Sequence, residues 1–183
     1  MTTFSYELKI PKERVAVLIG KNGEIKKRLE EDTDTRLKVD SKEGDVFVEG
    51  EDAIKLYTTR EIILAVARGF NPETAMELLK SDYLFESINI QDFSRNKTDL
   101  LRIKGRIIGQ DGKTRRIIED LTETSISVYG KTVCIIGDPS NLSIARRAIE
   151  MLVRGSPHKK VYTWLEKMRS ALKMRSMGLS TDD

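Results

Sequence analysis

The chain has 183 residues, of which 39% are hydrophobic and 33% are charged, and its formal net charge at pH 7 is +3. A chain of this size and composition is typical of a globular protein with one or two small domains, and so small a net charge by itself identifies no partner. No apolar run approaches the roughly 18 residues of a membrane-spanning helix, so no membrane partner is expected.

The N-terminal residues 1–7 lack the basic start and the apolar stretch of a secretory signal. The single cysteine, Cys134, has no internal disulfide partner and stands in an apolar strand, where a core position is expected. Together these features predict a cytoplasmic protein.

Apolar periodicity divides the first half of the chain into short elements. In order they are a strand at residues 6–10, a short helix at 15–19, a Gly-x-x-Gly turn at 20–23, a helix through 25–29, strands at 37–39 and 46–48, a long helix at 53–67 and a last helix at 73–80. Asp52 is a helix-start signal, Gly69 suits the left-handed position after a helix, and Asn71 before Pro72 predicts another N-cap.

The second half repeats this order when Gly109 is aligned with Gly20. The matching signals include Asp138 at a helix start, Gly155 after the long helix, and Ser156 as the predicted N-cap before Pro157. The copies differ before the turn, where a strand at 84–90 is followed by an insertion at 91–99. We interpret the insertion as part of a longer or broken helix capped by Ser94, Asn96 or Thr98. The repeat predicts two domains, residues 1–81 and 82–183, each ending in a trailing helix.

Each Gly-x-x-Gly turn precedes a basic amphipathic helix, a pattern that favours binding of a nucleic-acid backbone. Glycine lets another chain approach closely, and the first N–H groups of the helix attract a phosphate. Between Arg102 and Arg116 there are six basic residues and one acidic residue, which favours the second copy as the principal site. The predicted RNA-binding residues are Arg106, Ile108, Gly109, Gln110, Asp111, Gly112, Lys113, Arg115, Arg116 and Ile117, with Gly20, Lys21, Asn22, Gly23, Lys26 and Lys27 in the first copy.

Unstacked bases would need an apolar groove beside the turn. Ile108, Ile117 and the strand at 126–128 are its predicted floor, although Ile117 could instead face only the core. Asp111 is an acid in a phosphate-binding turn; it either points outward, caps the following helix, or accepts a hydrogen bond from a base amino group. Replacing both glycines of a turn with Asp is expected to abolish RNA binding and to leave thermal stability nearly intact.

The element order resembles that of the KH domain, whose Gly-x-x-Gly loop clamps about four nucleotides of a single strand. The single strand before Gly20 and the long helix that ends each copy match the type I arrangement. The resemblance implies an α+β chain of two tandem type I KH domains, each with a three-stranded sheet and three helices and each followed by an extra C-terminal helix. One isolated Gly-x-x-Gly is weak evidence, but two in register within the full order are strong evidence.

Three stretches of the second half, residues 106–114, 144–146 and 152–162, resemble archaeal and eukaryotic KH proteins that bind the maturing 3′ end of small-subunit rRNA. The resemblance implies an archaeal single-stranded RNA-binding protein that contacts the 3′ region of 16S rRNA as a ribosome assembly and processing factor. It also implies protein partners in ribosome maturation or translation initiation. Eukaryotic members have lost the first Gly-x-x-Gly, whereas residues 20–23 keep it here, which leaves open which domain binds RNA.

The remaining polar and aromatic residues suggest no catalysis. His158 has no partners at metal-ligand spacing, so a surface or capping role is expected, and no metal or cofactor is predicted. Tyr162 and Trp164 are interpreted as packing residues, with an extension of the RNA surface as the alternative. No nucleophile, base and acid set is present, so the chain is not expected to be an enzyme. Two other functions stay open: a general two-KH RNA regulator without a ribosomal target, and a protein-interaction scaffold.

Overall fold

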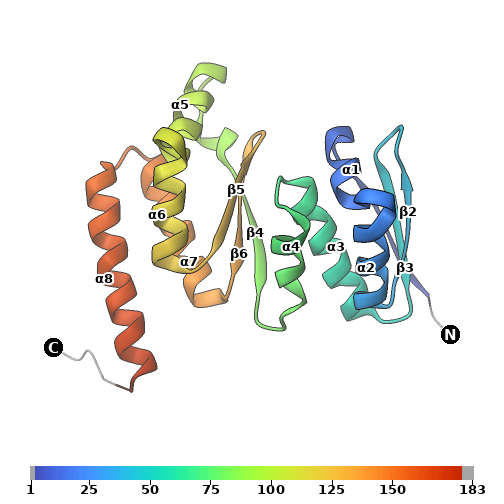
Figure 1. Cartoon of the computed structure of the whole chain (residues 1–183). Coiled ribbons are helices and arrows are strands. Elements are labelled where there is room, and N and C mark those ends of the chain that lie inside the picture. The colour runs from blue at the N-terminus through green and yellow to red at the C-terminus, as the bar shows by residue number, and fades with distance from the viewer. Residues whose placement is uncertain (1–2, 179–183) are drawn as a thin grey trace. The chain divides into compact units, whose positions relative to one another are not determined.

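The computed structural model describes residues 3–178 and has the α+β architecture expected from the sequence. The chain divides into two compact units, one ending at Phe85 and the other beginning at Glu86. Each unit contains one three-stranded antiparallel sheet with helices packed on a face of it (Figure 1). Among the described residues, no helix is long and apolar enough to cross a membrane.

The first unit has the strand order β1-β3-β2, so the last strand in sequence lies in the centre of the sheet. Its elements are β1 (Phe4–Lys9), α1 (Lys12–Ile19), the 3₁₀ turn η1 (Lys21–Gly23), α2 (Glu24–Thr33), β2 (Arg36–Asp40), β3 (Asp45–Gly50), α3 (Ala53–Ala67), α4 (Pro72–Ala75) and the 3₁₀ turn η2 (Met76–Leu79). Alternation along β3 sets the faces, because Val46 and Val48 are fully buried under the helices while Phe47 points away and is 45% exposed.

The second unit repeats this topology with the strand order β4-β6-β5. Its elements are β4 (Leu84–Asn89), the 3₁₀ turn η3 (Ile90–Phe93), α5 (Lys97–Ile108), the 3₁₀ turn η4 (Gln110–Gly112), α6 (Lys113–Thr122), β5 (Ser125–Tyr129), β6 (Thr132–Gly137), α7 (Pro139–Val153) and α8 (His158–Ser176). Ile103, Ile107, Ile118 and Ile149 meet in one core, and α8 adds Val161 and Leu165 to it. The trailing helix is therefore part of the second unit's core.

Helix boundaries follow the predicted caps with one exception. Asp52, Asn71 and Asp138 each accept backbone N–H groups of the helix that follows, as predicted. Of the three candidate caps in the insertion, the cap is Asn96, whose side chain accepts from the Asp99 N–H. The prediction for Ser156 is wrong: α8 begins one residue later than expected, so Pro157 has extended backbone angles and takes the N-cap position without a side-chain bond.

Candidate nucleic-acid interface

The two Gly-x-x-Gly turns have nearly identical backbones. Gly20 and Gly109 have φ of 75° and 73°, and the third residue of each turn, Asn22 or Asp111, has φ of 53°. Asparagine and aspartate are the non-glycine residues that tolerate this left-handed conformation best. The backbone therefore explains why an acid is tolerated in the second turn, and of the alternatives for Asp111 the capping of α6 is excluded, because no side chain caps that helix.

The two glycines of each turn have different physical roles. A Cβ on Gly109 would lie 2.7 Å from the backbone nitrogen of Thr114, and one on Gly20 would lie 2.9 Å from that of Ile25. A Cβ on Gly112 would meet only the Arg116 side chain, at 3.8 Å, and one on Gly23 would meet nothing within 4 Å. The first glycine is therefore needed for internal packing, and the second keeps an open surface. The expectation that both can be replaced without loss of stability is wrong for the first.

Charge near the turn distinguishes the two copies. Helix α2 carries three basic and four acidic residues, and its Lys26, Lys27 and Arg28 each lie within 3.8 Å of an acid one turn later. Helix α6 carries three basic and two acidic residues, and Lys113, at its first position, forms no ion pair within the described part of the chain. The turns offset part of this difference, because the first turn contributes Lys21 and the second contributes Asp111. What favours an anion at the start of α6 is that the helix itself begins with the basic Lys113, whereas α2 begins with the acidic Glu24.

Arg106 has a structural task that its position in the sequence does not reveal. Its guanidinium donates to the carbonyl oxygens of Leu152 at 3.2 Å and Ser156 at 2.5 Å, at the end of α7. In the first unit Arg14 donates to Val66 at 2.8 Å and Phe70 at 2.7 Å, at the matching end of α3. We call this contact, which one arginine makes in each unit, the arginine clamp. In the second unit it engages two of the three guanidinium nitrogens of Arg106, although this residue was predicted to attract RNA.

The groove between α6 and the edge strand β5 is polar. Glu119 accepts the Ile126 N–H at 2.7 Å and lies 3.9 Å from Nε of Arg115, while Ile126 itself is only 3% exposed. Glu30 makes the same contact with the Leu37 N–H of β2, at 2.6 Å. Ile126 is thus a core residue, and the predicted apolar groove floor is wrong at this position.

Ile117 does not face this groove. It is two residues from both Arg115 and Glu119, a rotation of about 200° around the helix axis. Instead it lines a hollow of about 460 Å³ on the other side of α6, together with Gln110, Asp111, Lys113, Arg116 and Asp120. Arg116 folds back over this hollow and donates to the carbonyls of Asp111 and Gly112. Five of the ten predicted residues of the second copy therefore line this hollow. Arg106 and Gly109 line an adjoining hollow that shares Gln110 and Lys113 with it, and Arg115 faces Glu119.

Glu119 and Glu30 are the polar residues that sequence reasoning missed. Each stands four residues after a basic residue of the same helix and seven before the strand residue whose N–H it accepts. The recurrence of this spacing in both copies was a usable signal. Burial raises the pKa of the Glu119 carboxyl above its ordinary value, and the hydrogen bond from Ile126 opposes that rise.

We expect Glu119→Gln to change the pH dependence of stability. A raised pKa means that the folded state binds the proton more tightly than the unfolded state. The stabilisation is therefore complete below the unfolded value, near 4.5, and is lost as pH rises through the folded pKa. The amide oxygen still accepts the Ile126 N–H, so the melting temperature of the variant relative to the original protein should increase between pH 4 and pH 7. Glu166→Gln, on the exposed face of α8, is the control and should show a constant difference.

Residues predicted to have structural roles are mostly found in them. Cys134 is buried, and Trp164 packs against the core of the second unit. The Tyr162 hydroxyl bonds the buried Thr114 hydroxyl at 2.9 Å, and His158 Nε2 bonds the Arg106 carbonyl at 2.9 Å, so His158 joins α8 to α5. Within residues 3–178, no group of three His, Cys, Asp or Glu side chains could hold a metal ion.

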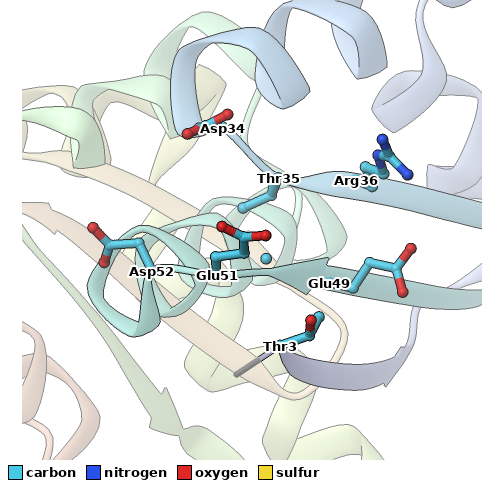
Figure 2. Close-up of a pocket in the computed structure, with 8 residues that line it drawn as sticks. Thr3, Asp34, Thr35, Arg36, Glu49, Glu51 and Asp52 are labelled. Atoms are coloured by element: carbon cyan, nitrogen blue, oxygen red, sulfur yellow. The ribbon is translucent and has the colours of Figure 1, made fainter. Parts of the chain in front are cut away.

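The first unit has an acidic pocket of about 530 Å³ away from its Gly-x-x-Gly turn. Figure 2 shows the carboxylates around it, and its lining includes Asp34, Glu49, Glu51 and Asp52 with Arg36 as the basic residue. Lys38 and Lys55 lie within 4 Å of two of these acids, Glu49 and Asp34. Such a surface repels phosphate, so a nucleic-acid backbone is not expected on this end of the sheet.

The fold and the two Gly-x-x-Gly turns identify the class of protein to which the chain belongs. Each unit has the element order of a type I KH domain with an intact Gly-x-x-Gly turn between its first two paired helices. Comparison of sequences agrees: residues 84–170 match the model of the eukaryotic-type KH domain, which is of type I, and residues 5–68 match the general KH domain model.

Comparison with related proteins places the chain in one family within the KH-domain proteins. A KH domain-containing protein of Methanocaldococcus jannaschii is 44% identical over 170 residues, which are 91% of this chain and 74% of that protein. The pre-rRNA-processing protein pno1 of Aspergillus fumigatus is 40% identical over 69% of this chain, which spans about half (48%) of its length. In a crystal structure of an a/eIF2alpha-aDim2p-rRNA complex from Pyrococcus horikoshii, the matching chain is 46% identical, with a TM-score of 0.86, and 92% of this chain and 95% of that one are covered. The chain belongs to the family of two-KH-domain proteins that includes these archaeal and eukaryotic proteins.

Proposed function

We propose that the protein binds single-stranded RNA from the 3′ region of small-subunit rRNA and acts in ribosome assembly without catalysis. The second KH domain is the principal site. The single observation that carries this proposal is the open second glycine of its turn, Gly112, beside the uncapped start of α6 and Lys113, which has no ion pair with any of residues 3–178. These groups offer a phosphate a close approach, a positive charge and the positive end of the α6 dipole.

The relatives supply the ribosomal target. Eukaryotic members of the family are named for pre-rRNA processing, and the P. horikoshii relative was crystallised with rRNA. A chain with this fold and this turn can use the same class of RNA, because the Gly-x-x-Gly loop contacts backbone nucleotides and leaves the bases to the neighbouring groove. Work on assembling ribosomal subunits would place the protein in the cytoplasm.

The first domain has a second candidate function, binding of a partner protein. Its helix α2 carries more acids than bases, and the acidic pocket of Figure 2 adds negative charge to the same unit. The crystallised relative was bound to a/eIF2alpha as well as to rRNA. A protein with a basic surface is therefore a better match for the first domain than RNA is.

The test is direct binding of a fluorescent single-stranded RNA that carries the 3′ end of 16S rRNA. We expect binding that is tighter than to a scrambled RNA of equal length, and a logarithm of the affinity that falls linearly with the logarithm of salt concentration. Equal affinity for both RNAs would remove the ribosomal target and leave a general RNA regulator. Absence of RNA binding at low salt would contradict the RNA function itself and favour the scaffold.

A further inference from the structure

Gly105 is a glycine that the fold does not require. The chain has twelve glycines, of which nine have positive φ, and a Cβ on Gly50 or Gly137 would lie 3.2 or 2.8 Å from a threonine methyl group. Gly105 alone has neither feature: it lies inside α5 with ordinary helical angles, and its Cβ would meet nothing within 4 Å. Glycine inside a helix lowers stability relative to alanine, so a compensating use lies outside the chain's own packing.

Gly105 lines a hollow of about 410 Å³ on the face of α5 opposite the core. The α5 side of this hollow is the helical stripe Arg102, Gly105, Arg106 and Gly109. The opposite side is formed by α8 and the start of α6, which contribute Lys113, Thr114, His158 and Tyr162. We call this hollow the α5–α8 groove. Its α6 and α8 walls are held together by the bond between Thr114 and Tyr162.

The charge of the α5–α8 groove selects its ligand. Its charged lining residues are Arg102, Lys113 and Arg106, whose guanidinium donates to two carbonyls but keeps its positive charge, and no acid of the described part of the chain lines it. Arg102 uses Nε and one terminal nitrogen on Asp99, which lies outside the groove, and the other terminal nitrogen remains as a donor. A phosphate–ribose backbone is the ligand that combines negative charge with a need for close backbone approach.

The groove is continuous with the Gly-x-x-Gly turn. Gln110 and Lys113 line both the α5–α8 groove and the hollow beside Ile117, so the two surfaces meet at the turn. We propose that the α5–α8 groove is a second RNA-backbone subsite, which holds phosphates of nucleotides beyond those clamped by the turn. Gly105 is the position at which the strand runs close to helix α5. This inference rests on the proposed RNA function of the second domain and extends it.

Gly105→Gln tests the subsite because glutamine is a good helix former whose neutral side chain fills part of the groove. Two RNAs are compared: a four-nucleotide RNA that the turn can hold alone, and a twelve-nucleotide RNA that also reaches the groove. In the unmodified protein the longer RNA should bind more tightly. In Gly105→Gln the short RNA should keep its affinity, and the longer RNA should bind about fivefold or more weakly, which is the loss expected for one or two phosphate contacts.

Two controls exclude unfolding and an unspecific effect of the glutamine side chain. The melting temperature of Gly105→Gln should not fall, so weaker binding cannot result from unfolding. Ala16, the exposed counterpart of Gly105 in the first unit, provides the matched variant Ala16→Gln, which should leave both affinities unchanged. If the unmodified protein binds both RNAs and Gly105→Gln binds them equally well, the subsite is refuted and the proposed function stands. If the unmodified protein binds neither RNA, the proposed function fails, and the subsite fails with it.

Discussion

Gly112→Asp is expected to lower the affinity of the protein for single-stranded RNA by about thirtyfold to a hundred-and-fiftyfold. A carboxylate placed about 5 Å from a bound phosphate costs about 2–3 kcal/mol at the effective dielectric of a protein surface. The fold should tolerate the change, since aspartate accepts the left-handed conformation and a Cβ at this position meets only the end of the Arg116 side chain, at 3.8 Å. Fluorescence anisotropy with the 16S rRNA 3′-end RNA measures the loss.

Gly112→Asn separates charge from shape. Asparagine has the size and backbone preference of aspartate without its charge, so this variant should lose much less affinity than Gly112→Asp. Substituting Gly23 with Asp and with Asn tests whether the first domain binds RNA, because a Cβ at Gly23 would meet nothing within 4 Å. If the second domain is the principal site, the difference in RNA affinity between the Asp and Asn variants should be clearly smaller at Gly23 than at Gly112. Equal affinities of Gly112→Asp and Gly112→Asn would contradict a phosphate at this turn.

Gly109→Ala is expected to destabilise the second unit by roughly 2–5 kcal/mol. Its φ of 73° with ψ of 175° lies in a region that essentially only glycine adopts, unlike the left-handed helical angles of Gly112, and the added Cβ would lie 2.7 Å from the Thr114 backbone nitrogen, so the turn and α6 must separate. Trp164 is the single tryptophan and packs against this unit's core, so its fluorescence during urea unfolding reports on the second unit.

Gly105→Ala is the matched control for Gly109→Ala. It makes the same chemical change four residues earlier, where the helix has room, and should raise the free energy of unfolding by about 0.5–1 kcal/mol. If the free energy of unfolding falls in Gly109→Ala and rises in Gly105→Ala, packing requires the turn glycine and does not require the helix glycine. An unchanged urea midpoint for Gly109→Ala would mean that α6 can move away from the turn at little cost.

Sequence patterns predicted the element order, the repeat and the turns, because these depend on local signals. Asp52, Asn71 and Asp138 cap their helices through bonds to residues two or three positions away, and alternation along β3 is visible in Val46 and Val48. Ser156 failed because the chain stays extended at Pro157, which takes the N-cap position of α8 in its place. A local cap signal therefore locates a helix start only to within about one residue.

The groove between α6 and β5 was harder to predict than the Gly-x-x-Gly turn. Ile117 is apolar and next to the core residue Ile118, but which side of α6 faces β5 depends on how the helix packs on the sheet. The contact between Glu119 and Ile126 fixes that side, and it turns Ile117 away. The partners of Arg106 lie 46 and 50 residues away along the chain, so no local pattern indicated that its guanidinium is occupied. Long-range contacts, and not residue type, decided these positions.

The arginine clamp has a consequence for the cost of binding. Arg14 and Arg106 fasten the helix that enters each turn to the end of the long helix, and Gly20 and Gly109 pack that turn against the start of the next helix. Each loop is therefore preorganised before any RNA arrives. Little conformational entropy is lost when a strand docks on such a loop, so more of the contact energy appears as affinity.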